Sequence, residues 1–93
     1  MLIPFSKYHG TGNDFVLIDN RHLNLQLSKS QVAQMCDRRL GIGADGLILL
    51  QMGERIPRMV YFNADGAEGS MCGNGGRCFV QFAQTLGVLS SEG

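Results

Sequence analysis

The apolar and polar positions of the chain predict four strands. Residues 3–8 alternate loosely between apolar and polar side chains, and residues 14–19 are mostly apolar; the glycine-rich turn between them predicts a hairpin. Two further apolar runs, at 47–52 and 58–63, predict another pair of strands. Residues 64–69 (ADGAEG) are all small or acidic and include two glycines, which predicts a turn after the last strand.

Two other segments have the apolar spacing of helices. Ser28 and Gln31 fit a capping box, and a helix is predicted from about 29 to 38. A second helix is predicted from about residue 74 or 75 to 86, ending at Gly87. Its apolar residues cover most of the helix circumference, which is typical of a helix wrapped by other structure. We therefore expect a central helix embraced by strands.

Composition and charge exclude several classes of function. The 93 residues fit one small domain or part of a larger one. Eight basic and eight acidic residues are scattered singly, so we expect no nucleic-acid partner and no binding to a membrane surface. No apolar run is long enough for a membrane span, and the start of the chain does not read as a signal peptide. The three cysteines, with no C-x-x-C pair, favour free thiols in the cytoplasm over disulfides or zinc.

Neither the glycine motif at 41–46 nor the histidines and lysines of the chain predict a bound cofactor or metal. Residues 41–46 match the dinucleotide-binding spacing of glycines, but a helix precedes them and a strand follows, the reverse of the required order. A tight helix-to-strand connection is the better interpretation. His9 and His22 lie in different segments, so no metal site is expected. Lys7 and Lys29 are not near a phosphate-binding loop in sequence, so chemistry without pyridoxal phosphate or any other cofactor is expected.

Cys72 is the candidate for chemistry. It stands immediately before the glycine-rich stretch 73–76, which is predicted to open a helix. A helix N-terminus favours the thiolate, and glycine leaves backbone N–H groups accessible to an anion. Taken alone, the cysteine fits a small buried side chain equally well. Asn63 and Asn74 favour the reactive interpretation, because they add neutral polar groups suited to an amino-acid substrate.

Four segments, in this order and spacing, resemble the diaminopimelate epimerase family. They are KYHGTGNDFVLID at 7–19, CDRRLGIGADG at 36–46, YFNADG at 61–66 and MCGNGGRCF at 71–79. The resemblance covers nearly the whole chain. It implies an α+β fold, in which a mixed and mostly antiparallel sheet is rolled around a central helix, with one additional helix.

The resemblance also implies an activity and a site. The family interconverts LL- and meso-diaminopimelate, a step of lysine and peptidoglycan synthesis, without a cofactor and with two cysteines on opposite sides of the α-carbon. Cys72 matches the first catalytic cysteine. Asn13 and Asn63 match asparagines that contact substrate, and Gly73 and Asn74 match the backbone contacts beside the thiol.

This chain departs from the family pattern at several positions. Gly46 stands where some members carry a substrate-contacting glutamine, and Gly76 where alanine is common. Cys36 and Cys78 match no catalytic position. The resemblance covers only the first of the family's two halves, and the second cysteine belongs to the other half. Residues 1–93 are therefore expected to form an N-terminal domain truncated at its C-terminal end and inactive alone.

Two alternatives stay open. The first is another cofactor-independent isomerase of the same fold, resembling proline racemase or the phenazine-pathway isomerase, which a substrate panel would reveal. The second is a non-catalytic module that self-associates as a homodimer, because loss of a second half would expose an apolar face. Light scattering would distinguish this module from a monomer.

Overall fold

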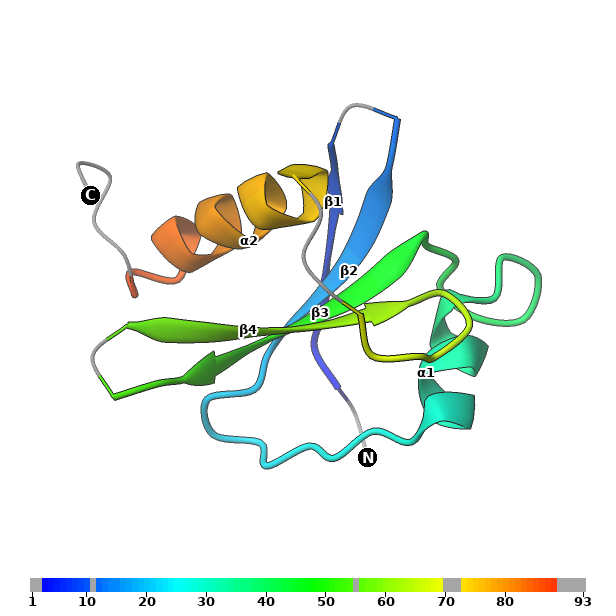
Figure 1. Cartoon of the computed structure of the whole chain (residues 1–93), viewed down its shortest axis with the longest axis horizontal. Coiled ribbons are helices and arrows are strands. Elements are labelled where there is room, and N and C mark those ends of the chain that lie inside the picture. Colours follow the sequence, from blue (N-terminus) through cyan, green and yellow to red (C-terminus); the bar gives the residue numbers. More distant parts are fainter. Residues whose placement is uncertain (1–2, 11, 55, 70–72, 89–93) are drawn as a thin grey trace.

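The computed structural model describes residues 3–10, 12–54, 56–69 and 73–88, with the side chains of residues 73 and 74 excepted (Figure 1). The elements are β1 (Ser6–His9), β2 (Asp14–Asp19), α1 (Lys29–Cys36), β3 (Gly46–Met52), β4 (Pro57–Asn63) and α2 (Gly73–Thr85). The predicted strands and helices are all present. α1 ends two residues earlier than predicted, because Asp37 has an extended backbone and its carboxylate accepts the backbone N–H groups of Arg39 and Leu40.

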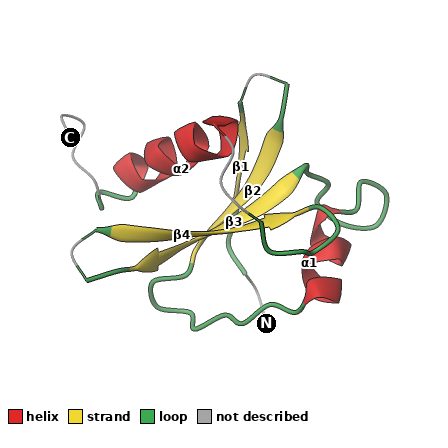
Figure 2. Cartoon of the chain, viewed as in Figure 1, coloured by secondary structure: helices red, strands yellow, loops and turns green. Residues whose placement is uncertain are grey.

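The four strands form one sheet in the order β1-β2-β3-β4 (Figure 2). β1 and β2 are antiparallel, β2 and β3 are parallel, and β3 and β4 are antiparallel. A parallel pair cannot be joined by a tight hairpin and needs a crossover connection, which the segment containing α1 provides. The predicted α+β class and the mixed, mostly antiparallel sheet are confirmed.

The sheet is the middle of three layers. Successive side chains of a strand point to opposite faces, and both faces of β2 are buried. Phe15 and Leu17 belong to the core beneath α2, whereas Val16 and Ile18 belong to the core beneath α1. β3 divides in the same way between the two cores. This two-sided burial explains why these two central strands are almost continuously apolar in sequence.

The described sheet does not roll around α2. The helix packs on one face of an open sheet through Cys78, Phe79, Phe82 and Ala83, whereas Val80 on its outer side is 43% exposed. Here α2 is a covering helix, and the prediction of a helix embraced by strands is not met by these residues. The physical reason is the number of strands: a barrel of about eight strands has an interior just wide enough to be filled by side chains, and the described sheet has four.

Local sequence signals set the start of α1 and the end of α2 as predicted. Ser28 and Gln31 form the capping box: the Ser28 hydroxyl accepts the Gln31 backbone N–H at 3.1 Å, and the Gln31 side chain accepts the Ser28 N–H at 2.8 Å. α2 is terminated by Gly87, which has a φ of +78°. The N–H groups of Gly87 and Val88 donate to carbonyls of the last helical turn, as in a Schellman motif.

The glycines at 41–46 make a close helix-to-strand connection, as predicted. A Cβ at Gly41 would overlap the carbonyl oxygen of Gln34 in α1, and Gly43 has a φ of +84°. The motif therefore serves packing between α1 and β3.

Neither of the two described helices is long and apolar enough to cross a membrane.

Candidate active site

Three of the residues singled out from the sequence lie at one end of the sheet. Asn13 immediately precedes β2, Gly46 opens β3 and Asn63 ends β4. The strand register pairs Gly46 with Phe15 on one side and with Asn63 on the other. Two strand spacings, about 10 Å, therefore separate Phe15 in β2 from Asn63 in β4, and Asn13 lies two residues before Phe15. We call this edge the site end of the sheet.

The first turn of α2 lies toward the same end. In Figure 1 this turn (yellow) is on the side where β2 begins, and the last turn (orange) is toward the opposite end. Gly73 and Asn74 are its first two residues. A helix N-terminus carries a partial positive charge, which suits a carboxylate. Cys72 lies outside the described residues, so its predicted role stays a prediction.

Asn63 is held by a turn that brings the chain back along β4. The Asn63 N–H donates to the carbonyl of Ala67 at 2.9 Å, and the Gly69 N–H donates to the carbonyl of Tyr61 at 2.9 Å. A Cβ at Gly69 would come within 2.8 Å of Nδ2 of Asn63. The glycine therefore lets the asparagine side chain lie directly against the returning backbone, shortly before the chain reaches α2.

Gly46 has no room for a side chain. A Cβ at this position would meet the carbonyl oxygen of Phe62 at 2.9 Å and the hydroxyl of Tyr61 at 3.0 Å. The tyrosine hydroxyl thus occupies the space into which a longer residue at position 46 would extend. A glutamine contact at this position is accordingly absent from this chain, and a polar group of Tyr61 stands in the same place.

A charged cluster that was not predicted from the sequence lies beside Asn13. The Asp14 carboxylate is part of a residue only 8% exposed. Both terminal nitrogens of Arg38 donate hydrogen bonds to it, at 3.0 and 2.8 Å, and Nζ of Lys7 lies 3.1 Å from its Oδ2. The Arg38 guanidinium, followed by Lys7, holds the pKa of Asp14 well below its usual range despite burial, and Asp14 in turn raises the pKa of Arg38. Asp14 is therefore ionised at neutral pH.

Asp45 extends this cluster to Asn13. Its Oδ2 accepts the backbone N–H of Asp14 at 3.1 Å and the amide Nδ2 of Asn13 at 3.2 Å. Its Oδ1 lies 3.2 Å from Nη2 of Arg38. A polar hollow of about 280 Å³ is lined by His9, Gly10, Gly12, Asn13, Asp14, Arg38 and Asp45. The cluster gives Asn13 a fixed charged support on one side of this hollow.

The sequence did contain a signal for the cluster. Its members lie within the segments 7–19 and 36–46; Asp14 begins the predicted strand 14–19, and Asp45 stands two residues before the predicted strand 47–52. A sequence profile of the diaminopimelate epimerase family matches residues 5–92, which include both segments. The chain belongs to the diaminopimelate epimerase family.

Individual diaminopimelate epimerases are similar to this chain over most of its length. The enzyme of Chlorobaculum tepidum is 59% identical over 80 residues, 85% of this chain and 31% of the relative. That of Microcystis aeruginosa is 54% identical over 96 residues, 100% of this chain and 34% of the relative. That of Flavobacterium psychrophilum is 52% identical over 91 residues, 92% of this chain and 34% of the relative. The chain thus spans about a third of the length of these curated relatives.

The two described cysteines, Cys36 and Cys78, do not form a reactive pair at the site end of the sheet. Cys36 lies in the core beneath α1 and Cys78 in the core beneath α2, on opposite faces of the sheet. Each is 3% exposed. Burial raises the pKa of the Cys36 thiol, which disfavours the reactive thiolate. Among the described residues, no group of three or more His, Cys, Asp or Glu side chains is placed to hold a metal ion.

Proposed function

We propose that this chain is the N-terminal, Cys72-bearing part of a cytoplasmic diaminopimelate epimerase, which interconverts LL- and meso-diaminopimelate without a cofactor. The observation that carries the proposal is the family match over residues 5–92. That range includes Cys72 together with Asn13, Asn63, Gly73 and Asn74. Similarity at 52–59% identity to enzymes named diaminopimelate epimerase supports this substrate over that of another isomerase of the same fold.

The proposed chemistry is a proton transfer at carbon. The α-proton of an amino acid is very weakly acidic, so removal by the Cys72 thiolate requires stabilisation of the developing negative charge. Donors fixed at the start of α2 are suited to the substrate carboxylate into which that charge spreads. Asn13 and Asn63, at the site end of the sheet, are suited to anchor the polar groups of the substrate.

The second thiol of the reaction comes, in this proposal, from outside the chain. Cys36 and Cys78 are buried in separate cores and neither is suited to deliver a proton to the opposite side of the α-carbon. The chain alone should therefore be inactive. We further propose that additional strands of the complete protein cover the outer side of α2, where Val80 is exposed, and complete the rolled sheet.

A segment exchange tests the proposal. The matching segment of the Chlorobaculum tepidum epimerase is replaced by this chain, and chiral analysis follows the conversion of LL-diaminopimelate to the meso form. We expect activity in the exchanged protein, its loss in Cys72→Ser, and its retention in the control Cys78→Ala. Robust meso product from the chain alone, at a rate insensitive to Cys72→Ser, would contradict the proposal. Conversion of proline instead of diaminopimelate would favour the alternative isomerase.

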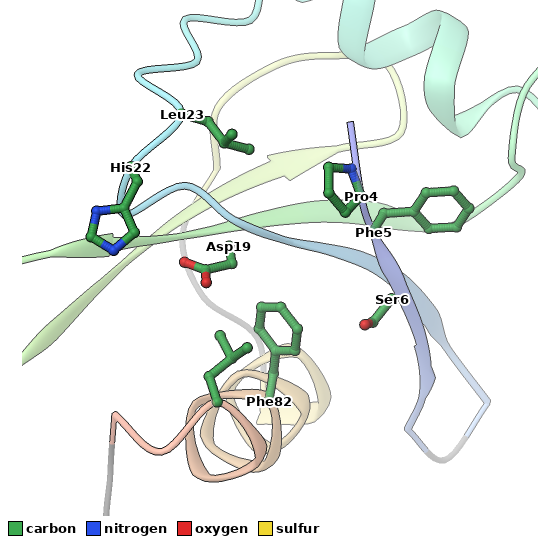
Figure 3. A pocket seen from close by; sticks show the side chains of 8 residues that line it. Pro4, Phe5, Ser6, Asp19, His22, Leu23 and Phe82 are labelled. Atoms are coloured by element: carbon green, nitrogen blue, oxygen red, sulfur yellow. The ribbon is translucent and has the colours of Figure 1, made fainter. Parts of the chain in front are cut away.

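A second candidate function, self-association as a non-catalytic module, is favoured by one apolar groove. The groove has a volume of about 340 Å³. Figure 3 shows Phe82 reaching from α2 toward Asp19, with Pro4 and Ser6 on one side and His22 and Leu23 on the other. Two lining residues, Phe5 and Leu23, are 48% and 40% exposed. Exposed apolar side chains around a groove commonly mark a protein interface, and a second copy of the chain is the proposed occupant.

A further inference from the structure

We propose that Asp45 is a positioning residue for Asn13, and that Arg38 and Asp14 hold Asp45 in place for this task. The inference rests on the proposed role of Asn13 as a substrate contact. It assigns a function to a charged cluster that touches the candidate site but contains none of the residues predicted to react.

Asp45 determines how the amide of Asn13 is turned. Oδ2 of Asp45 already accepts the backbone N–H of Asp14 and faces Asn13 as an acceptor, so the atom of Asn13 that lies 3.2 Å away is the amide nitrogen and not the oxygen. The two atoms of an amide present opposite chemistry to a ligand. Fixing the nitrogen against Asp45 therefore fixes which edge of Asn13 is presented to the hollow.

The turn before Asn13 is loosely packed at Gly12. This glycine has a φ of +84°, and none of the described atoms would lie within 4 Å of a Cβ built on it. A side chain on such a turn loses rotamer freedom when it is ordered. A charge-assisted hydrogen bond to Asp45 offsets that loss before the substrate arrives, which is how pre-organised sites gain rate.

Asp45 is itself held from two further directions. Its carboxylate accepts the Asp14 N–H at 3.1 Å and lies 3.2 Å from Nη2 of Arg38. The side chain of Asp45 is 41% exposed, so burial alone does not restrain it. The planar fork of Arg38 contacts both carboxylates, and this geometry is not reproduced by a lysine.

The charges of the cluster balance. The carboxylates of Asp14 and Asp45 both contact Nη2 of Arg38 and would repel each other, and Arg38 together with Lys7 offsets their two negative charges. A balanced cluster attracts neither the ammonium nor the carboxylate of a zwitterionic substrate by net charge. Discrimination at this position then depends on the orientation of the Asn13 amide.

The first test reads that orientation in the chain itself. In ¹⁵N-labelled protein, the side-chain NH₂ resonances of Asn13 should shift in Asp45→Ala, whereas those of Asn63 should not. The control Asp19→Ala removes an arginine-paired aspartate from the opposite end of β2 and should leave Asn13 unchanged. An Asn13 amide that does not respond to Asp45→Ala, or responds equally to Asp19→Ala, overturns the proposal.

The second test measures catalysis in the exchanged epimerase described above. We expect kcat/KM for LL-diaminopimelate to fall about tenfold in Asp45→Ala, with recovery of most of the loss in Asp45→Asn, whose side-chain oxygen still accepts from Asn13. The kcat/KM of Arg38→Met should also fall, whereas that of the control Arg21→Met should equal the parent value. Parental kinetics in Asp45→Ala overturn the proposal. An inactive parent exchange would instead count against the epimerase function, and the amide resonances of Asn13 would still decide the role of Asp45.

Discussion

Asp14 and Asp45 cap each other at the start of two adjacent parallel strands. The Asp14 N–H donates to Oδ2 of Asp45 at 3.1 Å. The Asp45 N–H is shared between the backbone carbonyl of Asp14 at 3.0 Å and its Oδ1 at 3.1 Å. β2 and β3 are parallel and have no hairpin to fix their relative position. The reciprocal pair therefore fixes the alignment of the two strand starts at the end of the sheet where Asn13 lies.

Acid should weaken the fold through Asp14. The Arg38 guanidinium lowers the pKa of Asp14 in the folded chain, whereas an aspartate in an unfolded chain titrates at about pH 4. The stabilisation is fully present above that pH and is lost as the pH falls through the lower folded value. Urea unfolding at pH 7 and at successive values below 4 should show the free energy of unfolding falling.

Asp14→Asn is the control for the acid effect. Its free energy of unfolding should be lower at pH 7 and should change less below pH 4. Some dependence should remain from Asp19, because the Arg21 guanidinium also lowers the pKa of that carboxyl. Identical slopes for the parent and Asp14→Asn would show that Asp14 is not responsible.

The capping box of α1 should contribute measurably to stability. Ser28→Ala removes the hydroxyl that accepts the Gln31 N–H and should cost about 1 kcal/mol of unfolding free energy. Gln26→Ala, at an exposed position two residues earlier, is the matched control and should cost little. Chemical denaturation of both variants at pH 7 makes the measurement, and equal stabilities would count against the capping role.

Gly66 and Gly12 both have positive φ but should respond differently to alanine. At Gly12 (φ +84°) no atom of the described residues lies within 4 Å of the added Cβ, so Gly12→Ala should cost only backbone strain, about 1 kcal/mol. At Gly66 (φ +90°) the Cβ would overlap the carbonyl oxygen of Lys29, so the cost should be on the order of 3 kcal/mol. Thermal unfolding compares the two, and a smaller loss for Gly66→Ala would contradict this packing.

Alkylation should distinguish the three cysteines. Cys36 and Cys78 are each 3% exposed, so their modification requires opening of the structure. We expect iodoacetamide to label Cys72 on the order of ten times faster than either, in keeping with its proposed reactivity. Peptide mass analysis after brief labelling identifies the modified residue. Equal labelling of all three in folded protein would argue against a special role for Cys72.

Self-association should depend on the apolar groove beside β1. Light scattering at high concentration should show dimers, and Phe5→Ser should reduce their fraction because Phe5 lines the groove and is 48% exposed. Leu40→Ser is a demanding control, since Leu40 is 92% exposed and does not line the groove. A monomer at all concentrations, or an equal effect of both substitutions, would exclude this mode of association.

Local signals in the sequence predicted most of the fold. The capping box at Ser28, the terminating Gly87 and the apolar runs of the strands act between residues close in sequence, so a pattern reveals them. The environment of α2 was not predicted correctly. Its nearly all-round apolar character indicated a fully enclosed helix, but whether strands cover its outer side depends on how many strands are present.

The candidate site was likewise predicted from the sequence only in part. The sequence by itself determined the family and named Cys72, Asn13 and Asn63, because short motifs at fixed spacing carry that information. Only the tertiary structure decided that Arg38 and Asp45 support Asn13. Asn13 and Asp45 are 32 positions apart, and Asp14 and Arg38 are 24 apart. Contacts over such separations form only when the parallel pairing of β2 and β3 brings the strand starts together, and no local pattern encodes that pairing.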